Sequence, residues 1–273
     1  MENSSALNFL QSKKIKYETS SYGEKNRSFF TIYSDMEGCE DFLAYIKTLP
    51  RTTIAKSSVF SKQEMEDANW YLLYVTRRAM DTSNVDFTYD AKCLYDITSW
   101  GMKRYHHLDQ INSFVSKKTP KWKTGYQFCS LEVGSRTKIF CSDYAKETII
   151  KSGINGVDFL PVLKGDLKTE TPDVSQLIFK NKLPFEAYKF IGKYEEEVCS
   201  MCGRKKYVFN EQNCHNILLN TEVIPKGIDA FGSKFKIGSG FGEEPLVISK
   251  KFYNLIFKEL KEKTSHVTLY PIA

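Results

Sequence analysis

Two stretches of the chain predict the same order of elements, and this repetition constrains the fold more than any other feature. Residues 138–163 predict a strand, a helix capped by Ser142 and a strand that contains Pro161. Residues 246–272 predict the same series with Ser249 and Pro271. The serine and proline are 19 residues apart in the first stretch and 22 in the second. A repeated unit implies a repeated fold, so we expect two related lobes.

The rest of the pattern predicts more strands than helices. Strands are predicted at residues 29–33, 70–76, 126–133, 138–141, 157–163, 246–248 and 267–272. Helices are predicted at residues 37–49, 142–152 and 249–260. Gly134–Ser135 is a plausible hairpin turn, and residues 1–20 are polar and weakly patterned. The fold class is therefore α+β, with mixed, mainly antiparallel sheets and a few helices.

A basic, proline-broken segment suggests where the chain divides. Residues 117–125 read Lys-Lys-Thr-Pro-Lys-Trp-Lys-Thr-Gly, which is typical of a connection and not of an element. We predict an N-terminal α+β region at residues 1–120 and a first strand–helix–strand unit at residues 121–165. A C-terminal unit with the second strand–helix–strand series is predicted at residues 166–273.

The charge is spread evenly, which argues against nucleic acid as a partner. The net charge is +6; residues 1–125 hold 18 Lys and Arg against 15 Asp and Glu, and the remaining residues hold 21 against 18. A nucleic-acid surface normally needs a denser basic patch. Aromatic residues make up 14% of the chain, which suits both a core and a protein-recognition surface.

The sequence favours the cytoplasm. Residues 1–10 lack a basic segment followed by a long apolar one, so we expect no secretory signal. No window reaches the apolar length of a membrane-spanning helix, so no membrane partner is expected. The seven cysteines are an odd number and are scattered, which indicates a reducing compartment.

One motif suggests a structural zinc. Cys199-Ser-Met-Cys202-Gly203 has the pattern of a zinc knuckle, in which two thiolates converge on a tetrahedral ion. Cys214 and His215 are the candidates for the other two ligands, but adjacent side chains do not readily point at one metal. A knuckle that folds without metal is the favoured hypothesis, so no cofactor is expected. A redox role is disfavoured, because the preceding Glu195–Glu197 raise the pKa of a nearby thiol.

No pattern identifies a catalytic centre, and we do not expect an enzyme. His106 and His107 with Asp109 are candidates for acid–base chemistry, although such histidines more often have a structural role. The glycine-rich residues 238–242 lack the Lys-Ser/Thr of a phosphate-binding loop.

Three stretches taken together resemble a known group of proteins. They are residues 117–163 (including "GINGVDFLPV"), 198–207 ("VCSMCGRKKY") and 241–272 (including "LVISKKFY" and "LYPI"). The set resembles bacterial immunity proteins of polymorphic toxin systems that carry C-x-x-C-G motifs, and related uncharacterised proteins of Bacteroidetes. The resemblance implies a cytosolic antidote that binds a cognate protein toxin without catalysis. The chain departs from the pattern in having one C-x-x-C where the group has two.

An antidote needs aromatic anchors at its interface. The aromatic candidates in polar segments are Trp100, Tyr105, Trp122 and Phe241, with Tyr22 as a further one. Two alternatives remain open. A nucleic-acid-binding module would use the basic–aromatic residues 117–126 and 203–207, and a defence-system enzyme would use His106, His107 and Asp109.

Overall fold

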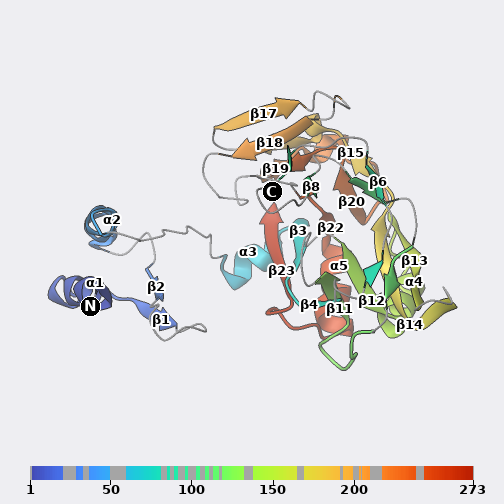
Figure 1. Ribbon diagram of the computed structural model, residues 1–273, viewed down its shortest axis with the longest axis horizontal. Helices are drawn as coiled ribbons and strands as arrows, with labels where there is room; N and C mark the ends of the chain where they lie inside the picture. The colour runs from blue at the N-terminus through green and yellow to red at the C-terminus, as the bar shows by residue number, and fades with distance from the viewer. Residues whose placement is uncertain are drawn as a thin grey trace. The chain divides into compact units, whose positions relative to one another are not determined.

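The chain forms two compact units, Met1–Ala55 and Lys56–Ala273, in the computed structural model. Figure 1 colours the first unit blue and the second from cyan to red. The structure describes residues 2–20, 29–32, 37–49, 60–80, 85–86, 89–91, 96–97, 103–104, 108–110, 113–116, 119–131, 138–164, 169–190, 193–198, 203, 205–209, 217–237 and 243–272.

The first unit packs two helices against each other. It contains α1 (Glu2–Ser12), β1 (Glu18–Ser20), β2 (Phe29–Thr31) and α2 (Cys39–Lys47), and β1 and β2 pair antiparallel. Leu10 of α1 and Phe42 and Ile46 of α2 are buried in one cluster. The polar pattern of residues 1–20 did not predict α1. Its buried face is short, because Ala6 and Leu10 are the residues of α1 that are buried in this cluster.

The second unit contains two large sheets. The seven-stranded sheet has the order β4-β11-β12-β14-β13-β10-β5, and the five-stranded sheet has the order β15-β20-β22-β3-β23. The strands of the first are β4 (Arg78–Met80), β5 (Val85–Asp86), β10 (Val115–Ser116), β11 (Phe128–Leu131), β12 (Ile139–Ser142), β13 (Val157–Lys164) and β14 (Thr169–Phe179). The strands of the second are β3 (Trp70–Val75), β15 (Lys182–Leu183), β20 (Ala230–Ser233), β22 (Val247–Ser249) and β23 (Val267–Ile272).

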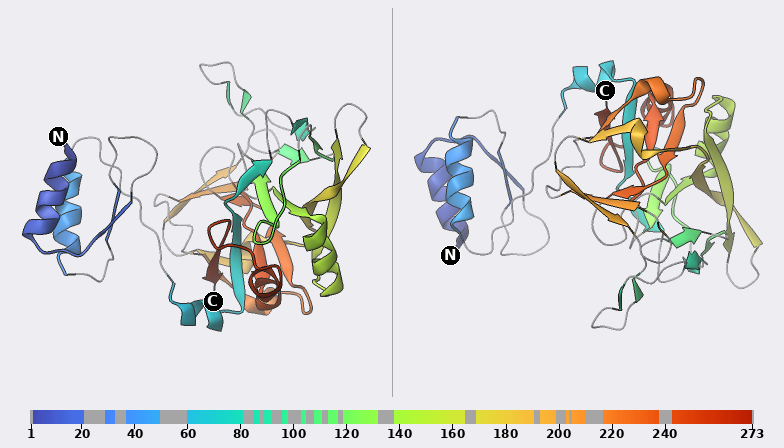
Figure 2. Two further views of the ribbon diagram at one scale, coloured as in Figure 1. Left: turned by 90° about the horizontal axis from the view of Figure 1, so that it is seen from below. Right: turned by 90° about the horizontal axis from the view of Figure 1, so that it is seen from above.

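Smaller sheets and three helices complete the second unit. The small sheets pair β6 (Tyr89–Ala91) with β9 (Leu108–Gln110), β7 (Asp96–Ile97) with β8 (Lys103–Arg104), β16 (Tyr188–Phe190) with β19 (Ile217–Leu219), and β17 (Tyr194–Val198) with β18 (Lys205–Phe209) and β21 (Lys236–Ile237). The helices are α3 (Lys62–Asp67), α4 (Asp143–Lys151) and α5 (Lys250–Asn254); the last continues as a π-helical turn, η4 (Leu255–Glu259). Two 3-10 turns are η2 (Phe185–Ala187) and η3 (Thr221–Val223). Figure 2 shows α4 beside the strands of the seven-stranded sheet, where it contacts β12 and β14.

The two large sheets contain the same five-strand arrangement. In β4-β11-β12-β14-β13 and in β15-β20-β22-β3-β23 the first pair of strands is parallel and the other three pairs are antiparallel. In both, a serine-capped helix connects the third strand to the fifth. We call residues 70–164 the N-terminal repeat and residues 169–272 the C-terminal repeat.

The two repeats exchange their first strands. β3 begins the N-terminal repeat but lies in the five-stranded sheet, whereas β14 begins the C-terminal repeat and lies in the seven-stranded sheet. The registers agree: Ser142 pairs with Val174 as Ser249 pairs with Trp70. Pro161 pairs with Ser175 as Pro271 pairs with Tyr71. Each repeat therefore completes the sheet of the other, so the two cannot be separated without breaking both sheets.

The ends of the two helices are also equivalent. The Oγ of Ser142 accepts a hydrogen bond from the Ala145 amide, and that of Ser249 accepts one from the Phe252 amide. Gly153 and Lys261 follow the helices with φ of 60° and 53°. The second helix holds one more residue between its serine and this position, and the π-helical turn η4 accommodates it.

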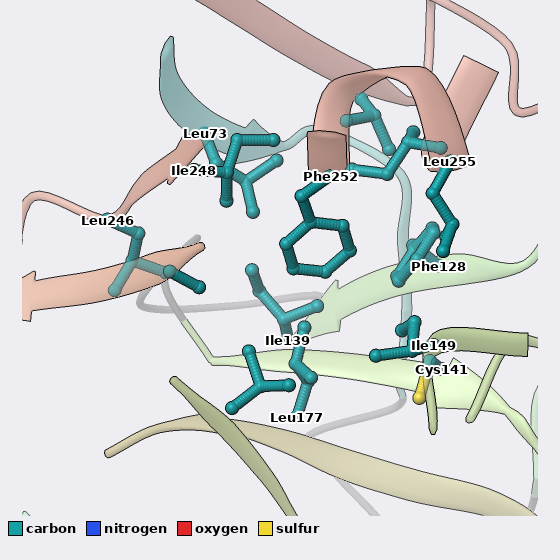
Figure 3. Packing of buried hydrophobic residues seen from close by; sticks show 14 of the residues in the cluster. Leu73, Phe128, Ile139, Cys141, Ile149, Leu177, Leu246, Ile248, Phe252 and Leu255 are labelled. Carbon is teal, nitrogen blue, oxygen red and sulfur yellow. The ribbon is translucent and has the colours of Figure 1, made fainter. Parts of the chain in front are cut away.

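The main core lies between the two sheets and is shared by both repeats. Figure 3 shows Leu73 and Ile248 of the five-stranded sheet, Ile139 and Leu177 of the seven-stranded sheet, and Phe252 of α5 converging on it. β3 is buried on both faces, since Leu73 enters this cluster and Leu72 enters a second one on the opposite face. β3 thus contributes to the cores on both faces of the five-stranded sheet.

The α+β prediction is confirmed, and so is the pattern of strands and capped helices at 138–163 and 246–272. Residues on both sides of the predicted boundaries at 120 and 165 share one sheet, because β4, β10 and β14 lie beside β11–β13. Within the described residues, no helix combines the length and hydropathy needed to cross a membrane.

Candidate functional site

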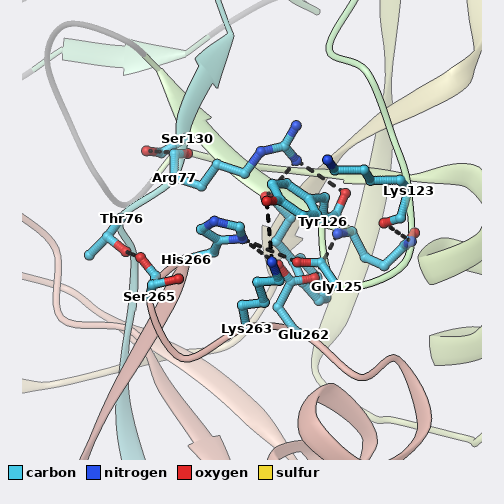
Figure 4. A network of polar contacts seen from close by, with 12 residues as sticks. Thr76, Arg77, Lys123, Gly125, Tyr126, Ser130, Glu262, Lys263, Ser265 and His266 are labelled. Atoms are coloured by element: carbon cyan, nitrogen blue, oxygen red, sulfur yellow. Dashed lines mark hydrogen bonds and ion pairs between the residues drawn. The ribbon is translucent and has the colours of Figure 1, made fainter.

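A basic and aromatic cluster surrounds Tyr126, at the edge where the two repeats meet (Figure 4). Tyr126 ends a tight turn in which Gly125 has a φ of 74°, a conformation that favours glycine. The turn leads into β11. The segment that follows η4 lies opposite the turn and contacts it through Glu262, Lys263 and His266. The cluster therefore unites residues 77, 122–126 and 262–266.

Arg77 holds the segment that precedes β11. Its guanidinium donates hydrogen bonds to the carbonyl oxygens of Lys121 (2.9 Å), Tyr126 (3.1 Å) and Phe128 (3.2 Å). The same group lies 5.3 Å from the ring centre of Trp122 and 5.1 Å from that of Tyr126. A single cation thus fixes both aromatic side chains relative to the sheet.

Together with Arg77, two lysines place three positive charges around the Tyr126 side chain. The Nζ of Lys123 lies 4.3 Å from the ring centre, and that of Lys263 lies 4.8 Å from it. Lys263 Nζ is also 3.3 Å from the Tyr126 hydroxyl. This hydrogen bond, and then the charges of Lys123, Lys263 and Arg77, lower the pKa of Tyr126 below its ordinary value.

A buried carboxyl group lies beneath the cluster. Glu262 is 5% exposed, and its Oε2 accepts a 2.6 Å hydrogen bond from the Gln127 amide. Burial raises the pKa of Glu262, although the Gln127 amide, His266 and Arg77 partly oppose the shift. His266 contacts the Gly125 carbonyl oxygen at 3.1 Å and lies against the Tyr126 ring at 4.4 Å.

A cavity of about 570 Å³ opens beside this cluster. Two aromatic side chains, Trp122 and Tyr144, line it together with three carboxylates, Asp143, Asp173 and Glu259. Its polar floor includes Gln127, whose Oε1 accepts a hydrogen bond from the hydroxyl of Ser142. The Trp122 Nε1 atom is buried without a hydrogen-bond partner among the described residues. The cavity therefore offers aromatic surface and charges of both signs.

The equivalent positions of the C-terminal repeat have different side chains. The two repeats can be aligned through Gly125 and Gly227, whose φ angles are 74° and 77°. Ile224 then stands where the N-terminal repeat has Trp122, and Ile228 where it has Tyr126. Asn181 likewise replaces Arg77, by the register of β3 and β14. Since the C-terminal repeat builds the same framework without these residues, the fold itself does not require them.

Of the aromatic anchors predicted from the sequence, the structure describes Trp122 and places it in the site. It is half-buried and packs against the cluster of Met80, Cys129 and Phe140. Trp100, Tyr105, Phe241 and Tyr22 lie outside the described residues, so their roles stay predictions. Tyr126 lies within residues 117–126, which the sequence predicted only as a nucleic-acid-binding segment. Arg77 and Lys263 were not predicted, because strands far apart in the chain bring them together.

The zinc hypothesis also stays a prediction. Cys199, Cys202, Cys214 and His215 lie outside the described residues, as do His106 and His107, and the side chain of Asp109 is not described. Cys199 and Cys202 fall between β17 and β18, which pair antiparallel with Val198 opposite Lys205. Among the His, Cys, Asp and Glu residues that the structure describes, no group of three or more could hold a metal ion.

The chain matches no protein-family model and no curated protein. What the site can do therefore follows from its geometry. Aromatic rings, exposed lysines and carboxylates around a cavity are suited to recognising a charged, partly apolar group of another molecule.

Proposed function

We propose that the chain is a cytoplasmic immunity protein that binds a cognate bacterial toxin by protein–protein contact and has no catalytic activity. The resemblance of residues 117–163, 198–207 and 241–272 to immunity proteins supports this class of function. The observation that carries the choice of site is the asymmetry between the repeats. Trp122, Tyr126 and Arg77 surround one edge of the framework, whereas Ile224, Ile228 and Asn181 stand at the equivalent edge.

The composition of the site supports a protein partner. Trp, Tyr and Arg are the residues most enriched among those that dominate binding energy at protein interfaces. Lys123 and Lys263 are exposed, and Lys123 lines the cavity together with Asp143 and Glu259. Mixed charges of this kind give a protein interface its orientation and specificity, while the negative charges disfavour a phosphate backbone.

The test begins with affinity purification of the chain from its host at moderate salt, with partners identified by mass spectrometry. We expect to recover one toxin-like protein at a one-to-one ratio. Co-expression of the chain should protect cells from the toxicity of this protein. Trp122→Ala should weaken binding by about 2 kcal/mol or more, the range of an interface anchor. Lys123→Glu with Lys263→Glu should weaken it as well while preserving the fold, because both side chains are exposed.

The matched control is Lys226→Glu with Lys234→Glu, which makes the same charge change at exposed positions of the C-terminal repeat. This control should bind the partner like the wild type. If the Trp122 variant and the Lys123/Lys263 variant bind the partner as tightly as the wild type, the proposed site is wrong. If no protein partner is recovered, the proposed function is wrong.

A nucleic-acid-binding module is the second candidate, because three cations lie within 5.1 Å of one aromatic ring centre. It predicts that affinity for single-stranded DNA or RNA falls steeply with salt. Lys123→Glu with Lys263→Glu should then reduce the slope of log affinity against log salt by about 2. Binding that is absent, or unchanged in this variant, would eliminate the candidate.

A further inference from the structure

In the C-terminal repeat, Lys251 occupies the position equivalent to one wall of the cavity. Lys251, two residues after the capping Ser249, reaches across to the N-terminal repeat. Its Nζ donates a 2.6 Å hydrogen bond to the carbonyl oxygen of Gly153, and lies 3.5 Å from Oδ2 of Asp229. The Lys251 ammonium thus joins the end of α4 to Asp229, which holds the capping serine of α5.

The N-terminal repeat lacks this ammonium. Tyr144, two residues after Ser142, stands where the other repeat has Lys251, and it is 61% exposed. Lys261 takes the place of Gly153, and Gln127 that of Asp229. The cavity lies among these three residues. The same framework therefore carries a lysine that bridges the two helices in one repeat and a cavity at the equivalent place in the other.

Three charged positions differ between the two places. Asp143 and Glu259 line the open cavity, and the equivalent positions of the C-terminal repeat are Lys250 and Lys151. Asp173, the third carboxylate of the cavity, corresponds to Asn69. At these three positions the C-terminal repeat is positive or neutral and the N-terminal repeat is negative. The carboxylate that contacts Lys251 is Asp229, whose counterpart Gln127 is neutral, so the two repeats carry their negative charge at different positions.

The other cations of the cavity do not neutralise this charge fully. The Nζ of Lys123 is held over the Tyr126 ring at 4.3 Å, and Lys261 is exposed at the cavity edge. The carboxylates do not form a group that could hold a metal ion. An organic cation on an apolar stem fits better, because its stem can lie on Trp122 and Leu260 and its charge can face the aromatic rings.

We propose that the cavity binds a lysine or arginine side chain of the partner protein, in the position that Lys251 occupies in the other repeat. The proposal rests on the proposed function in one respect, that a protein partner supplies the side chain. The partner would thus complete, from outside, a contact that the second repeat makes within the chain.

The test uses three acetylated and amidated tripeptides, Gly-Arg-Gly, Gly-Lys-Gly and Gly-norleucine-Gly, added to the full chain. Binding is followed by the NMR signal of the Trp122 indole N–H, which is assigned by comparison with Trp122→Phe. The arginine and lysine peptides should shift this signal at millimolar concentration, and the norleucine peptide should not. The absence of a shift with both basic peptides, or an equal shift with norleucine, would overturn the proposal.

Two independent variants test the mechanism. Asp143→Asn with Asp173→Asn and Glu259→Gln should weaken binding of the basic peptides at least about tenfold, since the carboxylates provide the attraction. Tyr144→Lys should block binding too, because it places the lysine of the other repeat in the cavity. Glu170→Gln, an exposed carboxylate of β14 outside the cavity, is the control and should bind like the wild type.

If the triple variant unfolds, Tyr144→Lys is the test of the proposal. Binding of the basic peptides to Tyr144→Lys with wild-type affinity would overturn it. The outcomes also separate this proposal from the proposed function. Peptide binding without any recovered toxin would support the cavity and contradict the immunity function. A toxin that binds the Tyr144→Lys variant as tightly as the wild type would contradict the cavity and leave the function standing.

Discussion

The hydroxyl of Ser249 donates a 2.8 Å hydrogen bond to Oδ1 of Asp229, the residue that directly precedes β20. Ser142 makes the equivalent hydrogen bond to Oε1 of Gln127, which directly precedes β11. In both repeats the helix cap is thereby tied to the neighbouring strand. The pair of contacts explains why both helices begin at a serine, and it leads to the first prediction.

Ser142→Ala should destabilise the chain more than Ser249→Ala. Each loses a helix cap, which costs about 1 kcal/mol. Ser142→Ala also leaves the buried Oε1 of Gln127 without its donor, which adds about 1 kcal/mol. In Ser249→Ala, Asp229 still accepts a 3.0 Å hydrogen bond from the Asn155 backbone amide, so this variant should lose less stability. Urea unfolding of both variants, with Ser152→Ala as control, measures the difference; equal losses would contradict the argument.

Lys251→Met should lower the free energy of unfolding by about 1 kcal/mol. The lysine loses its hydrogen bond to Gly153 and its contact with Asp229, but half of its side chain is exposed, which limits the loss. Lys258→Met, at an exposed position of η4, is the control. Thermal or urea unfolding should separate the two variants, and identical midpoints would show that the contact between the repeats adds nothing.

Lys263→Met should raise the pKa of Tyr126. The hydrogen bond from Lys263 is the largest cause of the lowered pKa, and its loss leaves the charges of Lys123 and Arg77. The titration can be followed by NMR of tyrosine labelled at the Cζ carbon, with Tyr126→Phe to assign the signal. Lys258→Met should leave the titration unchanged. A Tyr126 signal that titrates at the same pH in Lys263→Met and in the wild type would contradict the assignment.

Glu262→Gln should remove a fall in stability with rising pH. Burial raises the pKa of Glu262, so the folded chain binds this proton more tightly than the unfolded chain. The stabilisation is complete below the unfolded carboxyl pKa of about 4.3, and it is lost as the pH rises through the higher folded pKa. Melting temperatures across this range, compared with exposed Glu222→Gln, give the test. A constant difference between Glu262→Gln and the wild type at every pH would refute it.

The elements that the sequence predicts correctly are those where several local signals coincide. Ser142 and Ser249 as caps, and Pro161 and Pro271 within strands, were enough to predict both strand–helix–strand series. The helix α1 was missed because its buried face is short and is covered by residues distant in the sequence, such as Phe42 and Ile46 of α2. Among the residues of the site, the sequence identified Trp122, whose neighbours Lys121 and Lys123 made an aromatic residue in a polar segment stand out.

What the sequence alone determined is thus the α+β class, the two capped helices and the repetition itself. These follow from side-chain periodicity and capping chemistry, which act over a few residues. Only the tertiary structure decided that β3 and β14 exchange sheets, since a strand apolar on both faces does not specify its neighbours. The exchange brings Arg77, at the end of β3, beside Trp122 and Tyr126, and it brings the end of η4 opposite both. The site is therefore a product of long-range strand pairing, which no short-range pattern in the chain records.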